Sequence, residues 1–194
     1  MLKWLLTFFF LFYQTNLLAS NSIIETFTGK QESKLIPRSD HPKNTTFEFD
    51  APDIILVNQK NQDVGMRELF ELDRELVFAF FFTQCVTVCS TTTLSLKSIQ
   101  PHLAPDTLIA MISIDPETDT AALLQDYADK YHINEKNWLL LTGQNDQIIK
   151  FQKSFEAYRG NKMNHNTSLF IKRSGSNLIT EVKNNFYNIP ALLK

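Results

Sequence analysis

Only two cysteines occur in this chain of 194 residues, Cys85 and Cys89, so at most one disulfide can form. A chain of this length can bury a sizeable core without a disulfide, and a purely structural bridge is therefore a weak explanation for the pair. The chain also lacks a large excess of charge of one sign, because 19 Lys and Arg nearly balance 21 Asp and Glu, for a net charge of −2. Without a concentrated basic cluster, we expect no surface for nucleic acid.

The first 20 residues lack an uninterrupted apolar stretch of the ~20 residues that span a bilayer. Lys3 gives a positive start, the charge-free run 4–13 follows, and Ala19 and Ser20 offer small residues for cleavage. This pattern predicts a signal peptide at 1–20, with an uncleaved N-terminal anchor as the alternative. No cysteine lies near the segment, which excludes a lipid attached through a thiol. We therefore expect an exported, periplasmic protein whose contact with the inner membrane is at most such an anchor.

Residues 21–46 are polar and show no periodicity, so we interpret them as a linker and His41 within them as a solvated loop residue. Residues 47–194 are expected to form one domain. The composition, 43% hydrophobic and 12% aromatic, suffices for one core, and the chain is too short for two ordinary domains with tails. No internal repeat or low-complexity block is visible.

Two apolar runs dominate this domain, residues 76–82 and 107–114, and are typical of strands buried on both faces of a parallel sheet. Shorter strands are expected at 54–57 and 138–141, with a hairpin of strands 167–172 and 178–182. Helices are expected over 89–100, after Asp119 as N-cap, around Ile148, Phe151, Phe155 and Tyr158, and at 189–193. The alternation predicts an α/β fold. We expect a thioredoxin-like core with a mixed central sheet flanked by helices, plus an added hairpin.

The cysteine pair lies between the buried strand at 76–82 and the helix expected at 89–100. Unpaired backbone N–H groups and the dipole at a helix N-terminus favour thiolate over thiol. Thiolates are soft ligands that suit Cu(I) and Zn(II). Because three residues separate the cysteines, the loop can point both sulfurs at one ion, and it can also close into a disulfide. The pair is therefore predicted to bind metal, to be redox-active, or both.

A selective copper site needs a third ligand, and His165 is the best placed of the four histidines. It precedes the strand expected at 167–172, and in a thioredoxin-like sheet the loop before this strand approaches the turn that carries the cysteines. His102 and His132 follow expected helices and are interpreted as surface or capping residues. Met163 is a possible soft neighbour, and we interpret it as a packing residue.

Four motifs in this order resemble those of the Sco/SenC family over residues 47–182. They are FFFTQCVTVC at 80–89, SIDPETDT at 113–120, WLLLTG at 138–143, and a histidine, His165, before a strand. The resemblance implies a thioredoxin-like protein that binds copper through two cysteines and a histidine, here Cys85, Cys89 and His165. Asp115 is then either an acid near the site or a residue at the entry to a helix.

The same resemblance implies a role in assembling the binuclear copper site of cytochrome c oxidase. The implied partners are the copper-site subunit of that oxidase, or another copper protein, and a thiol reductant. The chain departs from the family where Val86 and Ser90 follow the cysteines in place of proline, and where Asn164 replaces the aspartate frequent before the histidine. The last change removes a carboxylate that could orient the imidazole.

An exported thiol–disulfide oxidoreductase using Cys85 and Cys89 is the main alternative. Thioredoxin-type enzymes have two residues between their cysteines and a proline in the facing loop, whereas this chain has three and no proline between Pro116 and Pro190. Peroxiredoxins have a proline shortly before the reactive cysteine, and none is present here. A structural zinc site wants a fourth protein ligand, and none stands out. The favoured prediction is therefore a copper metallochaperone rather than an enzyme.

Overall fold

The structure is a computed structural model that describes residues 44–133, 136–165 and 167–183. The expected signal peptide or anchor at 1–20, His41 and the expected closing helix at 189–193 lie outside the described residues.

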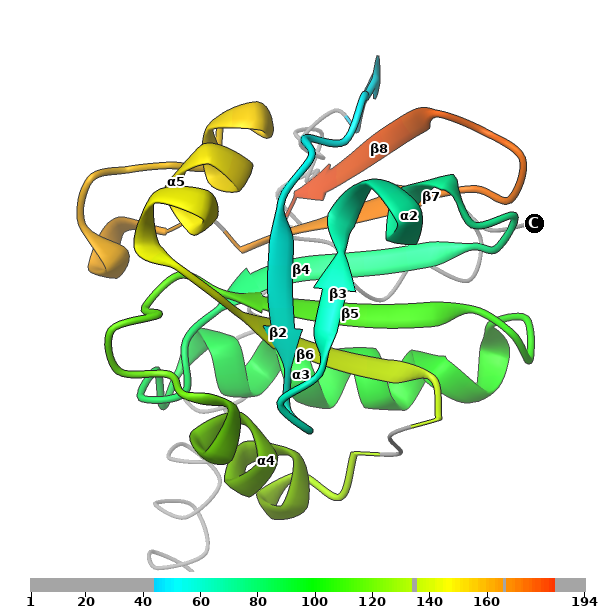
Figure 1. The fold of residues 1–194 in the computed structure, drawn as a ribbon. Coiled ribbons are helices and arrows are strands. Elements are labelled where there is room, and N and C mark those ends of the chain that lie inside the picture. The colour runs from blue at the N-terminus through cyan, green and yellow to red at the C-terminus, as the bar shows by residue number, and fades with distance from the viewer. Residues whose placement is uncertain (1–43, 134–135, 166, 184–194) are drawn as a thin grey trace, which may run out of the picture. The chain divides into compact units, whose positions relative to one another are not determined.

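One mixed β-sheet forms the centre of the described part of the chain (Figure 1). Its strand order is β1-β8-β7-β4-β5-β6-β2-β3. Strands β4, β5 and β6 are parallel, and the other neighbours pair antiparallel. The bounds are β1 Thr45–Glu48, β2 Ile55–Asn58, β3 Asp63–Gly65, β4 Leu76–Phe81, β5 Leu108–Ser113, β6 Trp138–Thr142, β7 Ser168–Lys172 and β8 Leu178–Lys183. The fold class expected from the sequence, including the hairpin of β7 and β8, is confirmed.

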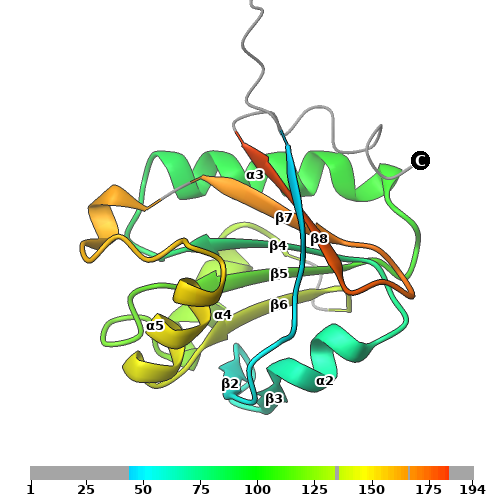
Figure 2. The same cartoon turned by 90° about the horizontal axis from the view of Figure 1, so that it is seen from above.

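Helices cover both faces of this sheet. They are α2 Met66–Glu71, α3 Val88–Ile99, α4 Ala121–Lys130 and α5 Asn145–Ser154, with 3-10 turns η1 Gln100–His102 and η2 Lys162–Asn164. Helices α2 and α5 pack on one face, and α3 and α4 on the other. Figure 2 shows α3 on the side of the strands opposite to α2 and α5. None of the described helices is long and apolar enough to cross a membrane.

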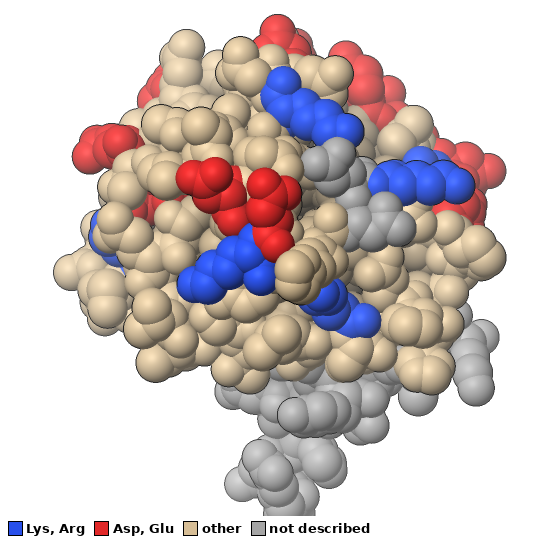
Figure 3. Space-filling view, turned by 90° about the horizontal axis from the view of Figure 1, so that it is seen from below, with Lys and Arg blue, Asp and Glu red and all other residues tan. Residues whose placement is uncertain are grey.

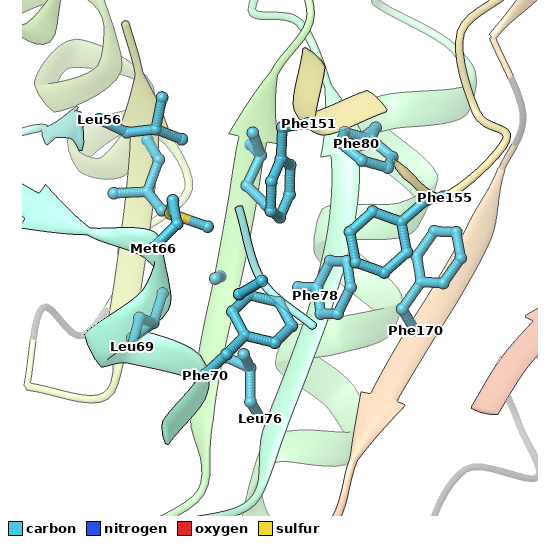
Figure 4. Close-up of a cluster of buried hydrophobic side chains, with 14 of the residues drawn as sticks. Leu56, Met66, Leu69, Phe70, Leu76, Phe78, Phe80, Phe151, Phe155 and Phe170 are labelled. Carbon is cyan, nitrogen blue, oxygen red and sulfur yellow. The ribbon is translucent and has the colours of Figure 1, made fainter. Parts of the chain in front are cut away.

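Alternation along the strands divides the core into two clusters. Side chains of successive residues point to opposite faces of a sheet, so Phe78 and Phe80 of β4 join one cluster while Val77 and Phe81 join the other. The first cluster, under α2 and α5, is rich in phenylalanine (Figure 4). The rings of Phe78 and Phe170 stack there with centroids 4.9 Å apart. The all-apolar run at 76–82 is thus explained by burial on both faces, as expected.

Three local details differ from the sequence-based expectation. The N-cap of α4 is Thr120, whose side chain accepts the Leu123 N–H, and not Asp119. Helix α5 ends at Ser154, before Phe155 and Tyr158. Strand β1 begins at Thr45, inside the segment interpreted as linker, because residues 45–48 pair with β8.

Helix α3 forms despite its run of three threonines, which have low helix propensity. The hydroxyls of Thr91, Thr92 and Thr93 donate to the carbonyl oxygens four residues earlier, at distances of 3.0, 3.0 and 2.9 Å. Such back-bonding satisfies a threonine hydroxyl inside a helix. The last of these bonds reaches the carbonyl of Cys89.

Charged side chains of both signs lie close together on the face shown in Figure 3. Acidic and basic groups are neighbours there and are surrounded by uncharged residues. That face therefore carries no field of a single sign.

Candidate metal centre

The pairing of β4 with β7 brings the cysteines and His165 together. These strands are antiparallel neighbours, with Ala79 opposite Leu169. In an antiparallel pair the end of one strand lies beside the start of the other. The cysteine loop, residues 82–89, follows the end of β4, and His165 precedes the start of β7. Two segments nearly 80 residues apart in sequence thus meet at one edge of the sheet.

The donor atoms of Cys85, Cys89 and His165 lie within 4.8 Å of one another. Cys89 Sγ is 3.4 Å from His165 Nε2, and the Cys89 N–H donates to Cys85 Sγ at 3.4 Å. Both cysteines are free thiols. The convergence of the three residues singled out from the sequence is therefore observed. His102 and His132 are exposed and stand outside this group.

The ring of His165 is oriented by the backbone. Its Nδ1 lies 2.8 Å from the carbonyl oxygen of Lys162. A carbonyl can only accept, so Nδ1 carries a proton and donates it, and Nε2 is the ring nitrogen that faces Cys89. The edge of the ring also meets Phe82, with centroids 5.4 Å apart. The Lys162 carbonyl thus accepts the hydrogen bond from Nδ1 that a carboxylate before the histidine could otherwise accept.

The two thiols have opposite acid–base character. Burial disfavours the Cys85 thiolate, but hydrogen bonds from the backbone and thiol of Cys89 and from the N–H groups of Thr87 and Val88 outweigh it, and the pKa of Cys85 falls below its usual value. Cys89 is only 1% exposed, and burial together with donation of its S–H to Cys85 raises its pKa strongly. The start of α3 therefore favours a thiolate at Cys85 and not at Cys89.

Asp115 lies near the site and acts on the segment that carries the histidine. It is buried, and its Oδ2 pairs with Lys162 Nζ at 2.6 Å. Lys162 also lies over the ring of Phe82, 5.5 Å from its centroid. Because the Lys162 carbonyl orients His165, this ion pair steadies the imidazole. A cavity of about 400 Å³, lined in part by Asp115, Lys162 and His165, opens beside them.

Asp119 contributes to the site in a way that the sequence did not reveal. It is fully buried and accepts hydrogen bonds from the Thr83 N–H at 3.1 Å, from Thr83 Oγ1 at 2.5 Å and from Ser113 Oγ at 2.6 Å. Thr83 begins the cysteine loop, so Asp119 anchors that loop. The sequence predicts only an N-cap at Asp119, a role that Thr120 takes in the structure.

Met163 contradicts its expected role. It lies in η2 and is 72% exposed, so the interpretation of Met163 as a packing residue is wrong. Met66 and Met111 are fully buried. Polar neighbours around Met163 in the sequence leave it at the surface.

A mixed sheet with helices on both faces, bearing two thiols and an imidazole at the end of β4, defines a thioredoxin-like protein with a soft donor set. The model of the SCO1/SenC family matches residues 44–191, and this chain belongs to that family. A curated relative, the SCO1 protein homolog of Bacillus subtilis (strain 168), is 35% identical over 104 residues. The match covers 50% of this chain and 54% of the relative, so the chain spans about half the length of that protein.

Solved structures share the fold. BsSco, described as having a disulfide switch and as a member of the Sco family of cytochrome c oxidase assembly proteins, aligns with a TM-score of 0.63 at 23% identity. The alignment covers 77% of this chain and 94% of that one. Bradyrhizobium japonicum ScoI with copper bound aligns with a TM-score of 0.59 at 21% identity, over 75% of this chain and 98% of its own. At these identities the likeness establishes the fold.

Proposed function

We propose that this protein binds one copper ion through Cys85 Sγ, Cys89 Sγ and His165 Nε2 and delivers it to a copper-receiving protein. The observation that carries the proposal is the convergence of these three atoms within 4.8 Å. Two sulfurs and one imidazole are soft and borderline ligands, a set that suits Cu(I). A structural zinc site is tetrahedral and usually closed by a fourth protein ligand, and among the described residues the group has three members.

The burial of the donors suits an ion that must be released. Cys89 is buried, whereas Cys85 and His165 are half-buried. An incoming ligand can approach from the side of Cys85 and His165 and displace them in turn. The likeness to a copper-bound ScoI supports copper as the cargo. The description of BsSco supports the copper-site subunit of a cytochrome c oxidase as the receiving partner.

Copper loading is coupled to the redox state of the cysteines in this proposal. Only the dithiol can supply two thiolates, and binding the ion releases the thiol protons. A thiol reductant is therefore a second partner. The signal peptide or anchor expected at 1–20 supports a location outside the cytosol, in the periplasm, where dithiols can be oxidised.

A direct test is Cu(I) titration of the reduced protein, with the affinity measured by competition against a chelator. The parent should bind one ion. His165→Ala should weaken binding by more than the ~10–100-fold that loss of an outer partner costs. His102→Ala is the matched control, since His102 lies in η1 outside the donor group, and it should bind as the parent does. Equal affinity of His165→Ala and the parent would refute the copper site.

Thiol–disulfide exchange is the second candidate function, and the contrast between the thiols favours it. A half-exposed thiol of lowered pKa beside a buried thiol of raised pKa is the pattern of an attacking and a resolving cysteine. In that case the protein should reduce a model disulfide at a rate abolished by Cys85→Ser and unchanged by His165→Ala. If the parent protein does not reduce the model disulfide, this second candidate function is refuted.

A further inference from the structure

Each cysteine is connected to helix α4 by a chain of two hydroxyls. Ser90 Oγ donates to the carbonyl oxygen of Cys85 at 3.3 Å, and the hydroxyl of Tyr131 donates to Ser90 Oγ at 2.8 Å. Ser90 stands where the family commonly has a proline, which has no hydroxyl. This chain of bonds, Tyr131 to Ser90 to Cys85, is called the first relay.

A second relay of the same form reaches the other cysteine. Thr93 Oγ1 donates to the carbonyl oxygen of Cys89 at 2.9 Å and lies 2.7 Å from the hydroxyl of Tyr127. Because Thr93 gives its single hydroxyl proton to the carbonyl, Tyr127 is the donor in the second bond. Tyr127 is 5% exposed, and its burial raises the pKa of its hydroxyl, which therefore keeps its proton.

Both relays start from one rigid element. Tyr127 and Tyr131 are four residues apart, at the end of α4, and their rings pack with centroids 4.6 Å apart. Lys97 Nζ of α3 also donates to the carbonyl of Tyr131. At the other end of α4, Asp119 holds Thr83 at the start of the cysteine loop. The loop is thus attached to α4 and its flanks at its beginning and at both cysteines.

We propose that Tyr127 and Tyr131 are positioning residues that hold the cysteine pair in its dithiol arrangement and so disfavour the disulfide. A disulfide needs sulfurs about 2.05 Å apart. To reach that distance, the sulfurs must leave the present arrangement, in which the Cys89 N–H donates to Cys85 Sγ at 3.4 Å. Backbone carbonyls fixed to α4 resist this change. The inference rests on the proposed function only in that the dithiol is the form that takes copper.

The test is the thiol–disulfide equilibrium with glutathione, measured without copper. Two electrons pass from the cysteine sulfurs to glutathione disulfide. Its S–S bond breaks, the Cys85–Cys89 bond forms, and the two thiol protons end on two glutathione thiols. Tyr131→Phe, Ser90→Ala and Thr93→Val should each shift the constant about fivefold towards the protein disulfide, the factor that one net hydrogen bond typically contributes. A fivefold shift corresponds to about 20 mV, and a variant of both tyrosines should shift the constant about 25-fold, or about 40 mV.

Two variants separate positioning from general damage to α3. Thr92 makes the same kind of backbone bond as Thr93, to the Val88 carbonyl at 3.0 Å, and within the described residues no tyrosine hydroxyl bonds to it. Thr92→Val should therefore leave the equilibrium within twofold of the parent. Ser90→Thr keeps the hydroxyl and should therefore show the equilibrium constant of the parent, unlike Ser90→Ala. This pair of variants tests the first relay even if Tyr131→Phe folds poorly.

Constants within twofold of the parent for Ser90→Ala and Thr93→Val would overturn the inference, as would an equal shift in Thr92→Val. Cu(I) titration of the same samples keeps the two proposals apart. A parent that takes no copper while the relay variants shift would refute the proposed function alone. A parent that binds copper while no variant shifts would refute the relays alone.

Discussion

Both faces of the sheet carry an apolar core, but they differ in the buried polar groups that accompany it. On the aromatic face, covered by α2 and α5, six phenylalanines pack against one another with no polar atom among their side chains; they are Phe70, Phe78, Phe80, Phe151, Phe155 and Phe170. On the site face, covered by α3 and α4, buried Thr93, Tyr127, Ser113 and Asp119 all form hydrogen bonds. Burial of rings stabilises without fixing direction, whereas hydrogen bonds fix direction at modest net gain.

Strand β4 contributes side chains to both the aromatic face and the site face. Phe78 and Phe80 face the aromatic side, and Val77 and Ala79 face α3 and the site. The end of this strand therefore leads directly into the cysteine loop while its other face is fixed by stacked rings. We therefore expect mutations on the aromatic face to change mainly the stability of the fold, and mutations on the site face to change mainly the position of the cysteine loop.

The largest effect on stability is expected on the aromatic face. Phe78→Ala removes a fully buried ring that packs on Phe70, Phe155 and Phe170. Unfolding in urea should show a loss of about 3–5 kcal/mol. At temperatures where the variant is folded, it should still bind one copper ion. Loss of copper binding by the folded variant would break the division between the two faces.

A smaller effect is expected from Asp119→Asn on the site face. An amide cannot accept the bonds from both Thr83 groups and Ser113 as the carboxylate does, and the stability loss should be about 1–3 kcal/mol. Glu117→Gln makes the same chemical change at an exposed position of the same loop and is the control. Urea midpoints that are equal for both variants would mean that Asp119 does not anchor the cysteine loop.

Lys172 should give a still smaller, pH-dependent difference. Its Nζ donates to the carbonyl oxygens of Leu72, Arg74 and Arg173, and burial lowers its pKa from the usual 10.5. Between the folded pKa and 10.5 the unfolded chain holds more protons, so this group makes stability rise with pH in that window. The stability of the parent minus that of Lys172→Met should grow as the pH rises towards 10.5. A difference for Lys172 that stays flat with pH would contradict the assignment.

The smallest effect is expected from Val86→Ala, between the cysteines. Val86 is 80% exposed, so its truncation should change the free energy of unfolding by no more than about 0.5 kcal/mol. Chemical denaturation of the reduced protein checks this. A loss similar to that of Asp119→Asn would show that the loop is held by its own apolar side chains and not by its hydrogen bonds.

Much of the fold could be predicted because the signals were local and strong. The short apolar runs at 76–82 and 107–114 are typical of buried strands, and β4 and β5 occupy them. The pairing of β1 with β8 could not be predicted, since residues 45–48 are mostly polar and exposed and only a distant partner makes them a strand.

The convergence of Cys85, Cys89 and His165 could be predicted from residue type and order, but the surroundings of these residues could not. Cys85, Cys89 and His165 carry chemistry that few other side chains share. The hydrogen bonds of Asp119, Ser90 and Tyr131 depend on where α4 lies in the fold. In the sequence alone, each of these residues has an ordinary local explanation. The lowered pKa of Cys85 and raised pKa of Cys89 likewise depend on which sulfur faces the N–H groups, a matter of tenths of a nanometre that residue spacing does not specify.

The antiparallel pairing of β4 with β7 has a thermodynamic consequence for the ion. In small zinc domains, the metal must gather its ligands from an unfolded chain, and much of its binding energy is consumed in that ordering. Here the strand ladder from Leu76–Lys172 to Ala79–Leu169 has already gathered sulfur and imidazole before any ion arrives. On the proposed function, removal of the ion would leave this architecture intact. The protein would then take up and release copper repeatedly without unfolding between cycles.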